Sequence, residues 1–91
     1  RLIHVQLTKE KGKDKKGKDH YRIKIDNLSP LILDGVVLAG PKLDADHMPT
    51  GLAGFSLPPH KSLSVPTGAE AVERLGLTEG VRVLAADLSG L

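Results

Sequence analysis

Cysteine and tryptophan are absent from this sequence of 91 residues, and its aromatic side chains are limited to Tyr21 and Phe55. Without thiols the chain can form neither disulfides nor thiolate metal sites, so packing alone has to stabilise its core. Leu, Val, Ile and Ala have to build that core, because they supply nearly all of its apolar side chains. Aromatic platforms on which nucleic-acid bases could stack are nearly excluded.

Long apolar runs are also missing. No run approaches the roughly 18 residues that span a bilayer, and the apolar start at residues 2–7 is too short and too alternating for a signal peptide. We therefore expect no membrane span. The length suits one domain, residues 1–91, with no room for a second. Because the sequence begins with Arg1 rather than Met, we expect this domain to be excised from a larger protein.

Catalytic and cofactor motifs are absent as well. There is neither a Gly-x-Ser-x-Gly elbow nor a glycine loop that could cradle phosphates. Asp44, Asp46 and His47 lie close in sequence, but without a recognised ligand spacing. The histidines are dispersed, at His4, His20, His47 and His60. The sequence therefore predicts no catalytic residues, no metal site and no cofactor, and we expect a protein that is not an enzyme.

The clearest pattern in the chain lies at residues 20–28, around which we expect the rest to be organised. Tyr21, Ile23 and Ile25 alternate there with three charged residues. A period of two predicts a half-buried strand with its large side chains on one face. Turn-forming Asn27 and Ser29 end it, and the apolar residues 31–39 follow closely enough to fold back.

Residues 1–8 alternate in the same way, with Ile3, Val5 and Leu7 on one face. We interpret them as a first strand near an edge of a sheet. Residues 9–19 follow with six lysines against three acids, a local charge of +3 in a chain of formal charge +2. Such a lysine-rich and glycine-rich block buries little apolar surface, and it predicts a mobile hairpin loop.

Two interpretations of residues 31–39 remain open. Asp34-Gly35 is a hairpin signal, so residues 31–33 could pair with residues 36–38. In the preferred alternative the loop extends to Asp34, and residues 35–39 form a third strand paired with the second. Residues 40–54 contain many helix and strand breakers and are expected to cross one end of the domain.

The last third of the chain predicts two short strands, one helix and a final strand. The strands are expected at residues 52–57, with Phe55 inward, and at residues 62–65. Residues 67–76 predict the helix. Thr67 and Glu70 have the spacing of a capping box, the segment has an apolar stripe, and Gly76 stands where the helix should end. Residues 81–88 are apolar on both faces, which predicts a strand in the centre of a sheet.

Short strands at this spacing favour an all-β fold, a two-layer antiparallel sandwich with one short helix before the last strand. Two segments carry a family resemblance, Ile25-Asp26-Asn27-Leu28-Ser29 and Leu57-Pro58-Pro59-His60-Lys61-Ser62. With them the chain resembles the immunoglobulin-like and fibronectin-III-like accessory modules of large secreted or surface proteins. It departs from them by its missing cysteine pair and core tryptophan, by His60 where such turns usually have Gly, and by the helix. The resemblance implies an extracytoplasmic or cell-surface location.

A second segment, residues 77–84, is similar to the helix-to-strand part of PDZ domains. Val81 stands where that family has Asp, and the carboxylate-binding loop of the family is missing. This resemblance implies peptide binding and gives one alternative function.

The lysine-rich loop gives another alternative. Lysines on a hairpin can contact an anionic polymer and add affinity that depends on salt but not on sequence. The three interspersed acids weaken such a field, and the loop lacks arginine for bidentate contacts. The candidate anion-binding residues are Lys9, Lys11, Lys13, Lys15, Lys16 and Lys18.

The leading hypothesis is a non-catalytic β-sandwich module of a larger, exported protein, acting as a spacer or protein-interaction domain. Its partners would be other domains of the parent chain or another protein. The first alternative is an anion-binding module that uses residues 9–18 on nucleic acid or acidic polysaccharide. The second alternative is a PDZ-like peptide-binding fragment.

Overall fold

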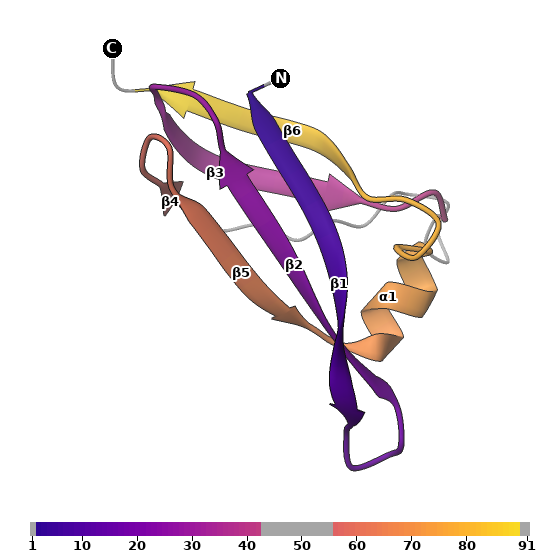
Figure 1. Cartoon of the computed structure of the whole chain (residues 1–91). Coiled ribbons are helices and arrows are strands. Elements are labelled where there is room, and N and C mark those ends of the chain that lie inside the picture. The colour runs from indigo at the N-terminus through magenta and orange to yellow at the C-terminus, as the bar shows by residue number, and fades with distance from the viewer. Residues whose placement is uncertain (1, 43–55, 90–91) are drawn as a thin grey trace.

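The structure, a computed structural model, describes residues 2–42 and 56–89 of the chain (Figure 1). Within them it is mostly β-strand, with one short helix. The elements in chain order are β1 (Ile3–Lys13), β2 (Asp19–Asn27), β3 (Ile32–Ala39), β4 (Ser56–Leu57), β5 (Ser62–Thr67), α1 (Ala69–Leu75) and β6 (Arg82–Ser89).

The strands form two antiparallel sheets. One sheet has the order β1-β2-β5, and the other has the order β4-β3-β6. β2 is therefore the middle strand of the first sheet, and β3 is the middle strand of the second. These sheets confirm the β-rich, antiparallel architecture that the alternating sequence predicts.

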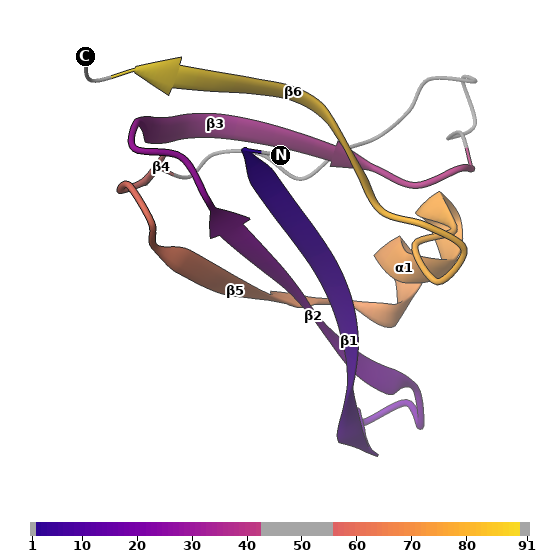
Figure 2. The same cartoon turned by 45° about the horizontal axis from the view of Figure 1, so that its top comes forward.

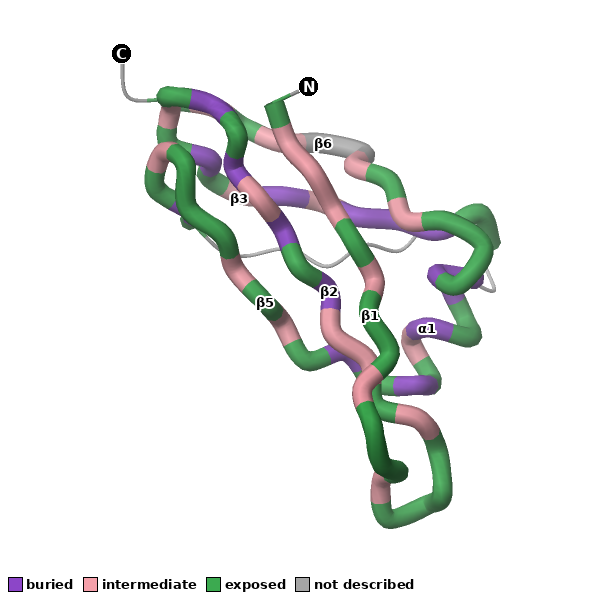
Figure 3. The backbone as a smooth tube through the Cα atoms, in the orientation of Figure 1, coloured by how far each residue is buried: buried purple, intermediate pink, exposed green. Residues whose placement is uncertain are grey.

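The two middle strands supply the centre of the core. Ile23 and Ile25 of β2 are buried in the same cluster as Leu33, Val36 and Leu38 of β3. Figure 3 shows the resulting alternation of buried and exposed residues along β2. Each buried aliphatic side chain contributes roughly 1.5–3 kcal/mol to stability, so this apolar face fixes how β2 is placed.

α1 lies where the two sheets separate, toward the end of the molecule from which the β1–β2 hairpin projects (Figure 2). Val72 and Leu75 of the helix, with Leu77 just after it, belong to the same core cluster as β2 and β3. A helix of seven residues is too short to be stable by itself, so this docking maintains it.

The predicted terminator of the helix is confirmed, but the predicted capping box is wrong. Gly76 has a left-handed backbone with a φ of 71°, and Leu77 N–H donates to Val72 O at 3.0 Å. At the other end Gly68 is the N-cap, and no side chain caps the helix. Thr67 is still in β5 and donates its hydroxyl to Val65 O, so it is not available to the helix.

The β1–β2 hairpin is longer than the sequence suggested. Residues 9–19 were expected to form a mobile loop, but β1 continues to Lys13 and β2 begins at Asp19. Only a short tip remains, and Asp14 closes it: Asp14 Oδ1 accepts the N–H groups of Lys16 and Lys18, both at 2.8 Å. Gly17, with a φ of 76°, completes the turn.

Both interpretations of residues 31–39 are wrong. They form one strand, β3, which pairs with β4 and β6 instead of β2. Asp34-Gly35 is not a hairpin turn, because the register shifts between Asp34 and Val36 and Gly35 has a φ of 77°. The dipeptide therefore forms a β-bulge. A bulge and a hairpin turn both need a residue with a left-handed backbone, so the same dipeptide suits either.

Two other expectations concern the second half of the chain. β6 was expected in the centre of a sheet, but among the described residues it pairs only with β3 and lies at an edge. The prediction came from apolar residues on both faces of the segment in the sequence. That pattern indicates that both faces are covered, and the faces of an edge strand can be covered as well. The expected crossing at residues 40–54, the inward Phe55 and the Asp44, Asp46 and His47 group lie almost wholly outside the described residues.

A buried amide joins the ends of these elements. Asn27, 1% exposed, donates its side-chain N–H groups to the carbonyls of Leu31, Leu57 and Pro58 at 2.8–3.1 Å. Its Oδ1 accepts the backbone N–H and the hydroxyl of Ser29. The side chain thereby connects the end of β2 to the β2–β3 turn and to the β4–β5 turn, and it satisfies groups that would otherwise be buried without partners.

Candidate functional site

The six lysines predicted to bind anions all lie on the β1–β2 hairpin. Four of them have carboxylate partners within the domain. Lys9 and Lys13 both approach Asp19, whose carboxyl pKa is lowered mainly by a hydrogen bond from Lys13. The same contact raises the pKa of Lys13.

The other two paired lysines reach the helix. Lys16 Nζ lies 3.8 Å from Glu70 Oε1, and Lys18 Nζ lies 3.6 Å from Glu73 Oε1. These ion pairs connect the hairpin tip to the exposed side of α1. Lys11 and Lys15 have no ion pair in the described part of the chain. The structure therefore brings the predicted lysines together on one hairpin but leaves much of their charge offset by acids.

A second polar cluster lies on the surface of the first sheet. Asp26 of β2 is between His4 of β1 and Ser62 of β5, in register with both. Its Oδ1 accepts the Ser62 hydroxyl, and its Oδ2 is 3.1 Å from His4 Nδ1. The hydrogen bond from Ser62, followed by that from His4, lowers the pKa of the Asp26 carboxyl.

This cluster contains the residue types of a catalytic triad in another order. In a triad the imidazole lies between the hydroxyl and the carboxylate, so that it can take the proton of the hydroxyl. Here the carboxylate lies in the middle, and the hydroxyl donates to Asp26. The arrangement ties three strands together and does not activate Ser62 as a nucleophile.

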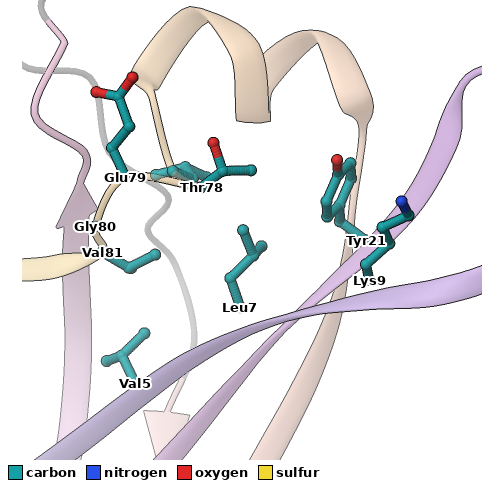
Figure 4. Close-up of a pocket in the computed structure, with 9 residues that line it drawn as sticks. Val5, Leu7, Lys9, Tyr21, Thr78, Glu79, Gly80 and Val81 are labelled. Carbon is teal, nitrogen blue, oxygen red and sulfur yellow. The ribbon is translucent and has the colours of Figure 1, made fainter.

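An opening near the core lies between β1 and the turn that joins α1 to β6. It is a hollow of about 580 Å³, lined by Val5, Leu7, Lys9, Tyr21 and residues 77–81. Figure 4 shows the side chains of Val5, Leu7 and Val81 pointing into it, with the polar groups of Lys9, Thr78 and Glu79 around it. An apolar floor with a polar rim is typical of binding surfaces for other molecules.

A smaller hollow of about 270 Å³ continues along β1. Ile3 and Val5 line one side of it, and residues 81–83 line the other. We call the two hollows together the β1–β6 seam. Both strands beside the seam are edge strands of their sheets among the described residues.

The described histidines, His4, His20 and His60, do not assemble a metal site. Within residues 2–42 and 56–89, no group of three or more His, Asp or Glu side chains is placed to hold an ion. His4 is engaged with Asp26, and His60 occupies a turn with a φ of 59°. Positive φ is uncommon for a residue other than glycine, so the backbone at this position would favour Gly.

The sequence alone did not reveal the seam. The alternation at Ile3, Val5 and Leu7 predicted one apolar face correctly, but the hollows also need residues 77–83, which lie 70 or more positions later. Which strand faces which is decided by long-range pairing that a single sequence does not show. The available signal was an apolar face on a strand expected near an edge.

Comparison with known proteins found no matching family model, no matching curated protein and no matching solved structure. No helix among the described residues is long and apolar enough to cross a membrane.

Proposed function

We propose that this chain is a non-catalytic, immunoglobulin-like β-sandwich that serves a larger, exported protein as a protein-interaction module. The observation that carries the proposal is the β1–β6 seam. Its floor is aliphatic, its rim is polar, and at about 580 Å³ its main hollow is large enough for side chains of another polypeptide. A module acting only as a spacer would not need such a surface.

The strand order supports the immunoglobulin-like part of the proposal. In that fold strands A, B and E are neighbours in one sheet, and C and F belong to the other. β1, β2 and β5 have the order of A, B and E, while β3 and β6 correspond to C and F by chain order. α1 then occupies the connection between E and F, where it covers the separating end of the two sheets.

The polar groups support the non-catalytic part. Asp26 is held by His4 and Ser62 together, and Asp19 by Lys9 and Lys13. Each of these carboxylates has a lowered pKa, so it stays ionised at neutral pH. Groups held in this way stabilise strand pairing, and they are not poised to exchange protons near neutral pH.

Site-specific crosslinking in the full parent chain tests the interaction. A photo-crosslinking residue at Thr78, on the rim of the seam, should join the module to another polypeptide or to another domain of the parent. The matched control is the same residue at exposed Ser64, on the far strand β5, which should give no such product. Equal crosslinking from both positions, or substrate turnover by the isolated module that the Asp26→Asn change abolishes, would contradict the proposal.

A second candidate function uses the hairpin. Lys11 and Lys15 are exposed, have no ion pair among the described residues, and lie on an arm that projects from the body of the molecule (Figure 1). Such an arm could add salt-dependent affinity for nucleic acid or acidic polysaccharide. The pairing of the other four lysines makes it the weaker candidate.

A further inference from the structure

We propose that the free edge of β1, between Ile3 and Leu7, takes up an extended segment of a partner protein as an additional antiparallel strand. The partner segment has aliphatic residues at alternate positions and acidic residues at its N-terminal end. This inference rests on the proposed function, because it names the kind of partner that the β1–β6 seam binds.

The hydrogen bonds of β1 define which of its backbone groups are free. Leu28 N–H donates to Leu2 O at 2.9 Å, so these two residues form a hydrogen-bonded pair of the antiparallel ladder. Such pairs alternate with pairs that exchange no hydrogen bonds. Ile3, Val5 and Leu7 therefore direct their N–H and C=O groups away from β2, toward the free edge.

The hydrogen bonds of β2 independently show which residues of β1 direct their backbone groups toward the free edge. Asn27 lies opposite Ile3, and its N–H donates to Lys61 O on the other side of β2. Asn27 thus does not exchange hydrogen bonds with Ile3. Within the described part of the chain, the free edge of β1 offers a row of unpaired donors and acceptors at the spacing that another strand requires.

The same three residues line the seam with their side chains. Val5 and Leu7 border the larger hollow, and Ile3 and Val5 border the smaller one. A strand added beside β1 would direct every second side chain toward the same layer. It would satisfy the free backbone groups and place alternate aliphatic side chains against the open apolar floor.

The first part of β1, residues 2–8, lacks the protection that the charged residues and the register shift at residues 9–13 give to the rest of the strand. Natural edge strands avoid pairing by being short or by carrying proline, charges or bulges. In the described residues β4 has only two residues, β5 has Pro66, and the β3–β6 ladder has two register shifts. Residues 2–8 of β1 contain no Lys, Arg, Asp or Glu, no proline, no glycine and no register shift.

Charge indicates the chemistry of the partner. The side chains of Ile3, Val5 and Leu7 favour an apolar segment, whereas Lys9 and Lys11 follow on the same strand. An antiparallel segment would meet these lysines at its N-terminal end, where acidic residues are complementary. A second copy of β1 suits the seam less well, because its Ile3, Val5 and Leu7 already pack against its own core.

The test is binding of a fluorescent peptide, Asp-Asp-Thr-Val-Thr-Val-Thr-Val, to the intact domain, measured by anisotropy. Val5→Pro removes the free N–H and blocks the edge, but leaves the β1–β2 hydrogen bonds in place. It should weaken binding about tenfold, since the hydrogen bond from the Val5 N–H is lost and the proline ring keeps the partner strand away from the edge. Ser64→Pro is the matched control on the free edge of β5, and should bind as the native domain does.

A second variant keeps the test decisive if Val5→Pro fails to fold. Thr78→Trp alters an exposed rim residue and fills the larger hollow without changing any residue of β1, so it should also weaken binding about tenfold. A peptide of the same composition with its valines contiguous should bind less well than the alternating one. Hydrogen exchange should show new protection at Val5 and Leu7 when the alternating peptide binds.

Three results would overturn the inference. Absence of peptide binding would do so and leave the proposed function standing, because crosslinking at Thr78 tests that function separately. Protection gained at β6 instead of β1 would place the strand on the other side of the seam. A dimer that Val5→Pro dissociates, seen by analytical ultracentrifugation without peptide binding, would make a second copy the occupant.

Discussion

At the scale of single residues, Asn27 shows how one polar side chain can organise several connections. It is buried among apolar side chains, and its amide makes hydrogen bonds to three carbonyls and to Ser29. An unpaired buried carbonyl costs about 1–3 kcal/mol. The amide of Asn27 therefore stabilises the fold chiefly because buried groups would lose their hydrogen-bond partners without it.

Replacing Asn27 with Ala should lower the free energy of unfolding by about 3 kcal/mol, because several buried groups lose their partners at once. Urea denaturation followed by circular dichroism measures this loss. Leu28→Ala, at the exposed neighbouring position, should change stability by less than about 1 kcal/mol. If Asn27→Ala also lowered the free energy of unfolding by less than about 1 kcal/mol, water would have replaced the amide.

Asp26 should make the stability of the folded domain depend on pH. Hydrogen bonds from Ser62 and His4 lower its pKa in the folded state. A lowered pKa means that the carboxylate contributes stability above the unfolded pKa of about 4, and loses it as the pH falls through the folded pKa. The native domain should therefore be more stable than Asp26→Asn at pH 7, and the difference should shrink in acid. Denaturation at a series of pH values measures it, and a constant difference would contradict the assignment.

At the scale of elements, α1 depends on close contact with the segment after β3. A Cβ at Gly40 would lie 2.1 Å from the carbonyl oxygen of Leu75, and Lys42 N–H donates to the same oxygen at 3.0 Å. The glycine therefore permits backbone to approach backbone. This contact holds the C-terminal end of the helix against the second sheet.

Gly40→Ala should destabilise the domain by about 2–3 kcal/mol, because neither backbone can move away without disturbing the core. Gly80→Ala is the matched control, since a Cβ there meets nothing within 4 Å and the φ of Gly80 is not positive. Thermal unfolding should separate the two variants clearly. Equal midpoints would mean that α1 shifts to accommodate the methyl group.

The hairpin gives a prediction about anions. If residues 9–18 bind polyanions, Lys11→Gln with Lys15→Gln should reduce the slope of affinity against salt by about two, one for each lost contact. Lys16→Gln with Lys18→Gln should have a smaller effect, because Glu70 and Glu73 lie within 4 Å of those lysines and offset part of their charge. Titration of labelled duplex DNA or heparin at several salt concentrations measures both slopes. Equal affinity after the hairpin is shortened to Asn-Gly would exclude this function.

The same elements show how far the sequence can predict the fold. The periods of β1, β2 and β5 and the glycine end of α1 are local, and the sequence predicted them. The partner of β3 and the edge position of β6 depend on pairing between distant residues, and both predictions were wrong. Thr67 illustrates a third case, since its capping-box spacing was real but the residue was already part of β5.

At the scale of the whole molecule, two sheets and a helix share one core, and the candidate site lies where their edges leave it open. Ile3, Val5 and Leu7 were predicted as an apolar face, so half of the seam could be predicted. The other half comes from the turn after α1, whose position depends on how the helix fills the space between the sheets. The lysine hairpin was predicted as a group, but its pairing with α1 was not.

The regular edge of β1 also has a consequence for handling the protein. Residues 2–8, seven residues without Lys, Arg, Asp, Glu, proline or glycine, resemble the short segments that stack into amyloid fibrils. A purified module stored at high concentration, with nothing covering that strand, should form thioflavin-positive fibrils over time. A lysine introduced at Gln6, where the side chain is exposed, should delay their appearance by electrostatic repulsion between stacked copies.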